Sequence, residues 1–208
     1  MISKRKLSGK EHRFFHLLEI NAAAAVSSIK ALQRQVANPQ AFTDSSEFVM
    51  IRRRTEAVIA LGNDTLCTRV ATAVQVRVLA SMSKALYEVP RNAQRIAERI
   101  KLGPQFLRDV SLIAYLALLE QATETVLVML KDLRASRTQR VQFHNDQLQA
   151  MRADANKRLL RLLGSLYAGN NEPVRSIFLK DIFDLLEKSF DGCCHAGEVI
   201  NDIALKLS

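Results

Sequence analysis

The stretch DLLEKSFDGCCHAGEVIND, residues 184–202, carries two side-chain patterns at once. Leu185, Phe190 and Val199 are spaced as an apolar helix face. Beside them, polar groups recur every three or four residues and form one stripe on the same helix: Asp184, Glu187, Asp191, His195 and Glu198. The stretch therefore predicts an amphipathic helix whose polar stripe is either a solvated face or a row of ligands.

The rest of the chain repeats the helical pattern. Its 208 residues include only seven Gly and four Pro, and the alternation typical of strands is absent over any useful length. The sequence predicts an all-α bundle of six long helices. The first expected helix covers residues 11–37, and the second begins at the cap residues 43–46 and weakens at 62–63. The third covers 70–102 and the fourth 104–133. The fifth runs from the 131–140 connection to 167, and the sixth follows the loop AGNNEP.

Two prolines mark positions where the expected helices change. Pro90 lies inside the third segment, so it should kink that helix or divide it near Val89. Pro104 follows the break KLGP and suits the first turn of the fourth helix.

A weak internal repeat is visible at an offset of about 100 residues. IRRRTEAVIALGNDTL from Ile51 and MRADANKRLLRLLGSLY from Met151 share spacing and a Gly near the C-terminal end. We expect residues 11–208 to be one domain built from two three-helix halves, about 11–101 and 104–207. The second and fifth helices should then occupy equivalent places.

The formal net charge of +9 favours an anionic partner, namely nucleic acid, a lipid surface or an acidic protein. Residues 1–10 should form a basic flexible arm, and the candidate contacts to an anionic partner are Lys4, Arg5, Lys6, Lys10 and Arg13. Nucleic-acid binding is an alternative, supported by RRR at 52–54 and LRASRTQR at 133–140. Trp is absent and aromatic residues make up only 6%, so platforms for base stacking are poorly supplied.

Catalytic and secretory signatures are missing. The sequence has no Gly-rich phosphate loop, no nucleophile elbow and no zinc-finger spacing, so we expect no enzyme. Cys193 and Cys194 are adjacent and unsuited to a disulfide framework, which fits a reducing cytoplasm, and a thiolate-assisted metal or redox role is the alternative to packing. The most apolar window, 110–130, holds Glu120 and Glu124, so we interpret it as a buried bundle helix rather than a membrane span.

Four segments resemble one known family, the PhoU-like proteins, in particular the single-chain form encoded beside low-affinity inorganic phosphate transporters. The segments are Phe14, Phe15 and Leu17, LASMSKALYE at 79–88, MRADAN at 151–156, and KDIFDLLEKSFDGCCHAGEVIN at 180–201. The resemblance implies a six-helix bundle that acts without catalysis as a regulator or accessory protein of inorganic phosphate transport. It also implies docking on a membrane transporter or sensor, a cytoplasmic location at or near the inner membrane, and room for a homo-oligomer.

The resemblance also implies acid pairs, four residues apart on facing helices, that gather iron or zinc in the family. Glu187 and Asp191 match such a pair, and His195 and Asp154 are candidate further ligands. At the other three pairs a residue departs from the family pattern: Arg52 precedes Glu56, Lys84 precedes Glu88, and Arg152 precedes Asn156. We therefore expect a degenerate site without cofactor, in which these cations replace the metal and Arg152 or another cation lies beside a carboxylate. Iron or zinc binding is the alternative.

Overall fold

The computed structural model describes residues 9–38, 46–67, 73–168 and 172–207. They form six α-helices and one short 3₁₀ helix: α1 Gly9–Ala37, α2 Ser46–Cys67, α3 Ala73–Leu102, η1 Pro104–Leu107, α4 Ile113–Arg134, α5 Thr138–Ala168 and α6 Pro173–Leu207. These residues contain no strand. The all-α, six-helix prediction is confirmed.

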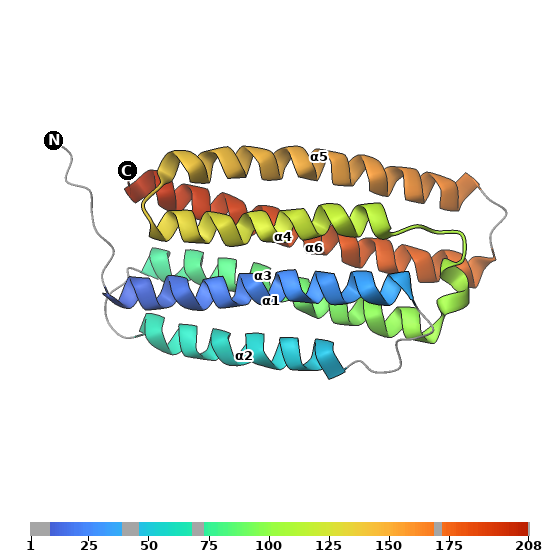
Figure 1. Ribbon diagram of the computed structural model, residues 1–208, viewed down its shortest axis with the longest axis horizontal. Helices are drawn as coiled ribbons and strands as arrows, with labels where there is room; N and C mark the ends of the chain where they lie inside the picture. The colour runs from blue at the N-terminus through green and yellow to red at the C-terminus, as the bar shows by residue number, and fades with distance from the viewer. Residues whose placement is uncertain (1–8, 39–45, 68–72, 169–171, 208) are drawn as a thin grey trace.

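The helices pack as two groups of three. α1, α2 and α3 contact one another, and so do α4, α5 and α6. The two groups meet where α3 packs on α6 and α1 packs on α4. Four helices thus form the centre, while α2 and α5 lie on opposite outer sides (Figure 1). α2 and α5 hold equivalent places in this arrangement, as the internal repeat predicts.

The central helices supply the core because their apolar residues recur at helical spacing. Leu116, Leu119 and Ala122 of α4 are fully buried, and so are Ile182 and Leu186 of α6. Among the described helices, α4 is the one long and apolar enough to cross a membrane by length and composition, and half of that window is buried inside the protein. Burial of this face against neighbouring helices accounts for its apolar character.

α3 runs through Pro90 as one helix from Ala73 to Leu102. Of the two predicted outcomes, the division near Val89 is wrong, while a kink stays a prediction. The residues around the proline, Val89, Ala93 and Ile96, are buried in the core at 0–1% exposure. Their packing against neighbouring helices holds the helical path although Pro90 has no N–H to donate.

The fourth helix begins later than predicted, and the fifth helix begins earlier than predicted. Pro104 starts the 3₁₀ turn η1, and α4 begins only at Ile113. A Cβ on Gly103 would lie 2.7 Å from the Phe106 ring and 2.9 Å from the Phe178 ring, so this turn needs glycine for its close packing. The connection expected over 131–140 shortens to residues 135–137, where Ser136 takes a left-handed conformation with φ of 55°.

The predicted basic arm falls mostly outside the described residues. Lys4, Arg5 and Lys6 lie outside them, as do all of residues 1–8. α1 begins at Gly9, so Lys10 and Arg13 belong to this helix, which overlaps the predicted arm at residues 9–10.

Candidate functional site

The predicted site residues lie at two equivalent helix–helix interfaces. We call the interface between α2 and α3 the first seam, and the interface between α5 and α6 the second seam. Arg52 and Glu56 lie on α2, and Lys84 and Glu88 lie on the facing α3. In the other half, α5 carries Arg152, Asp154 and Asn156, and the facing α6 carries Glu187, Asp191 and His195. The two seams are on opposite sides of the bundle, because α2 and α5 are its outer helices (Figure 1).

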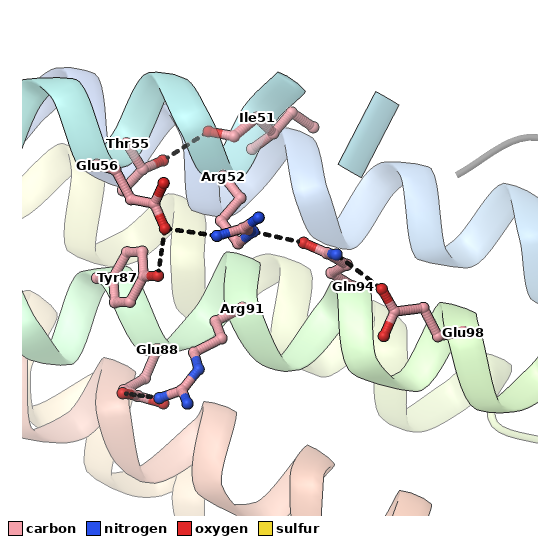
Figure 2. Close-up of polar contacts among 9 residues, drawn as sticks. All are labelled: Ile51, Arg52, Thr55, Glu56, Tyr87, Glu88, Arg91, Gln94 and Glu98. Atoms are coloured by element: carbon pink, nitrogen blue, oxygen red, sulfur yellow. Dashed lines mark hydrogen bonds and ion pairs between the residues drawn. The ribbon is translucent and has the colours of Figure 1, made fainter. Parts of the chain in front are cut away.

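A chain of polar contacts crosses the first seam (Figure 2). The Arg52 guanidinium lies 2.6 Å from Glu56 Oε1 on its own helix, and its Nε donates to Gln94 Oε1 of α3 at 2.9 Å. Tyr87 of α3 donates its hydroxyl to the same Glu56 oxygen at 2.8 Å. Gln94 continues the chain by donating to Glu98 at 2.7 Å. The contacts join α2 to α3 through the carboxylate of Glu56, whose charge is balanced by the Arg52 guanidinium.

These contacts change the titration of the groups involved. The Tyr87 hydrogen bond lowers the pKa of Glu56 below its ordinary value, and the Arg52 charge lowers it further. Burial and the neighbouring carboxylate raise the pKa of Tyr87, which keeps its hydroxyl proton available for donation. At neutral pH the seam therefore holds an ionised carboxylate between a guanidinium and a phenol.

Lys84 and Glu88 form no ion pair with each other. Glu88 accepts instead from Arg91 on its own helix at 3.0 Å (Figure 2). Lys84 is exposed and forms no ion pair with a described residue, and it lines a groove of about 440 Å³ between α2 and α3. The polar contacts here therefore form two separate clusters, one around Arg52 and Glu56 and one of Glu88 with Arg91.

The second seam has the cation–carboxylate contact that the sequence suggested. Arg152 Nη2 lies 2.9 Å from Asp191 Oδ1, and Nη1 lies 4.0 Å from Glu198 Oε1. Gln149 donates to the same Glu198 oxygen at 3.3 Å. The Arg152 and Asp191 side chains are 41% and 52% exposed, so solvent screens their attraction. This contact joins α5 to α6 on the surface of the bundle.

The other residues predicted for this site point elsewhere. Asp154 pairs with Arg158 one turn along α5 at 2.8 Å. His195 Nε2 lies 2.7 Å from Ser81 Oγ of α3. Glu187 and Asn156 are exposed and have no hydrogen bond or ion pair with a described residue. The candidate ligands are therefore divided among different partners.

The donor set as placed does not suit a metal ion. A guanidinium occupies the approach to Asp191 at hydrogen-bond distance, and a cation there disfavours a second cation. Within the described part of the chain, no group of three or more His, Cys, Asp or Glu side chains is arranged to hold a metal.

Both cysteines of the quoted stretch are inside the protein. Cys193 and Cys194 are each 1% exposed and free of disulfides. Burial raises the pKa of both thiols, that of Cys194 to about 12, so they are protonated at neutral pH. Both side chains therefore pack in the core as protonated thiols.

Sequence reasoning missed a buried carboxylate in the second half. Asp132, near the end of α4, is 3% exposed and forms ion pairs with Arg137 at 3.2 Å and Arg140 at 3.1 Å. His144 Nε2 lies 3.6 Å from the same carboxylate. The available signal was a lone acid within the basic stretch KDLRASRTQR, whose polar composition predicts a connection between helices. Its role is to fasten α5 to the end of α4.

The fold is shared with known structures. No protein-family model matches the sequence, and no curated protein matches it. A crystal structure from Shewanella oneidensis MR-1, named a PhoU-like phosphate regulatory protein, is 17% identical, with a TM-score of 0.61 over 95% of this chain and 98% of that one. A PhoU-like protein from the same organism is 16% identical, with a TM-score of 0.60 over 99% and 100% of the two chains. These likenesses confirm the sequence resemblance at the level of the fold: the chain is a six-helix bundle of the PhoU-like type.

Proposed function

We propose that this protein regulates, or assists, inorganic phosphate transport without being an enzyme. The observation that carries the proposal is the match along nearly the whole chain to a structure named a PhoU-like phosphate regulatory protein. At 17% identity this likeness concerns the fold, and because one fold can serve several functions, the regulatory role needs its own test. In this proposal the bundle docks on a membrane phosphate transporter or its sensor at the cytoplasmic face of the membrane.

The proposal includes a metal-free form of the acidic sites. Arg52 beside Glu56 and Arg152 beside Asp191 would supply the positive charge that a bound metal supplies among clustered acids. Metal analysis of protein purified without a metal-affinity tag tests this point. Stoichiometric iron or zinc that disappears in the Glu187→Gln/Asp191→Asn double variant would overturn the metal-free part.

Phosphate uptake by the source organism tests the regulatory role. Deletion of the gene should change the rate of phosphate uptake, or its response to phosphate starvation, by several-fold. Expression of the intact chain should restore the original behaviour, while sulfate uptake serves as the control that must not change. Identical phosphate uptake and identical starvation response in the deleted and parental strains would overturn the proposal.

A further inference from the structure

Large exposed apolar side chains gather at one end of the bundle. α3 and α5 end there, and α2, α4 and α6 begin there, beside η1 (Figure 1). We call this surface the η1 end and define it by five side chains, Leu102 at 83% exposure, Ile113 at 60%, Tyr167 at 67%, Val174 at 56% and Ile177 at 68%. Such a concentration on a folded protein indicates a surface that is covered by something other than water.

The shape of this surface is irregular. The five side chains come from the ends of four different helices. A hollow of about 820 Å³, lined in part by Leu107, Val110 and Ile113, opens beside η1. A rigid helical partner matches a continuous groove or ridge. A fluid apolar phase can follow an uneven surface, and a tyrosine places its ring in that phase while its hydroxyl stays with polar groups.

Charges around the η1 end leave a positive excess. Three of its carboxylates each have a cation of their own, in the pairs Asp109–Arg175 at 3.6 Å, Asp181–Arg99 at 3.3 Å and Asp184–Lys180 at 2.7 Å. Arg95, Arg108 and Arg161 are exposed and form no ion pair with a described residue, against the exposed carboxylates of Glu98 and Glu172. The surface therefore offers apolar side chains together with uncompensated guanidinium groups.

We propose that the η1 end binds an anionic lipid bilayer. The apolar side chains enter the boundary between headgroups and acyl chains, while Arg108 and Arg161 contact lipid phosphates. The helices then stand end-on to the membrane. This inference concerns lipid and goes beyond the proposed regulation of phosphate transport, so either one can fail without the other.

Sedimentation of the full chain with vesicles tests the proposal. The protein should bind vesicles of phosphatidylcholine with phosphatidylglycerol more strongly than vesicles of phosphatidylcholine alone. The Tyr167→Ser/Ile177→Ser variant should partition about tenfold more weakly, because it removes two inserted side chains. Phe143→Ser/Leu205→Ser is the matched control: its residues are 59% and 49% exposed, lie near the opposite end and should leave binding unchanged. Circular dichroism checks that each variant is folded.

Charge variants and a truncation complete the design. Arg108→Gln/Arg161→Gln should weaken binding at low salt and have little effect at high salt, since salt screens headgroup attraction. Absence of binding by the intact protein, or equal loss in the Phe143/Leu205 control, would overturn the proposal. So would binding that deletion of residues 1–8 abolishes and the Tyr167/Ile177 variant does not affect. A stable dimer that the Tyr167/Ile177 variant dissociates, without vesicle binding, would assign the surface to a second copy instead.

Discussion

The two equivalent seams differ in how an arginine on the outer helix is paired with a carboxylate. On α2, Arg52 has an acid one turn ahead, Glu56, and pairs within its own helix. On α5 the corresponding residue is Asn156, which carries no charge, and Arg152 reaches across to Asp191 of α6. The nearest available carboxylate decides whether the ion pair of an arginine lies within one helix or joins two.

The seams also differ in what holds the helices together. The first has cross-helix hydrogen bonds from Tyr87 and from Arg52 to Gln94. In the second, α5 and α6 approach so closely at Gly197 that a Cβ there would lie 2.5 Å from Leu148 Cδ2. Close apolar packing should therefore carry the second seam, and its exposed ion pair should contribute little.

The largest effect is expected where the second seam is closest. Gly197→Val should destabilise the protein by about 1–3 kcal/mol, because the new side chain overlaps the buried Leu148. Gly164→Val on α5 is the control, since a Cβ there meets nothing within 4 Å. Urea denaturation measures both. Equal stability of the two variants would show that close packing at Gly197 does not hold this seam.

A smaller effect is expected from the arginines. Arg52→Met should lower Tm by about 2 °C, since Gln94 Oε1 loses its donor and Glu56 keeps only the hydrogen bond from Tyr87. Arg152→Met should lower Tm by less than about 1 °C, because its pair is exposed and screened. Thermal melts at low and moderate salt measure the difference. A greater loss for Arg152→Met would reverse the comparison.

The first seam should also respond to acid. The folded-state pKa of Glu56 is lowered from 4.5, so its stabilising contribution is complete above that value and is lost as pH falls through the folded pKa. The difference in Tm between the wild-type protein and Glu56→Gln should accordingly be present at pH 7 and shrink below about pH 4.5. Melting curves from pH 7 to about pH 3 measure it. A difference that stayed constant throughout would exclude charge as its source.

The smallest effect comes from making α5 resemble α2. Asn156→Glu places an acid one turn beyond Arg152 and should stabilise the protein by about 0.3–0.5 kcal/mol through helix propensity and the new pair. Arg152 should then divide its contacts, so Asp191→Asn should cost less in this background than in the wild type. A double-mutant cycle measures that coupling. Purely additive changes would mean that the two acids do not compete for Arg152.

Most of the helices were predictable from the residues, whereas the segment between α4 and α5 was not. The apolar period of DLLEKSFDGCCHAGEVIND predicted a helix, and α6 contains the whole stretch. The basic KDLRASRTQR suggested a long loop, yet most of it is helical because Asp132 is buried and paired with the arginines that follow. Composition alone could not distinguish a solvated connection from one held by a buried carboxylate.

By itself the sequence determined the helix-forming segments, the sign of the charge and the positions of the cations Arg52, Lys84 and Arg152. These are properties of residue type and local spacing. Only the tertiary structure decided that Arg152 meets Asp191, that Asp154 turns to Arg158 and that His195 meets Ser81. The reason is geometric: a side chain's partner depends on how neighbouring helices are rotated and placed, and packing over the whole bundle sets that placement.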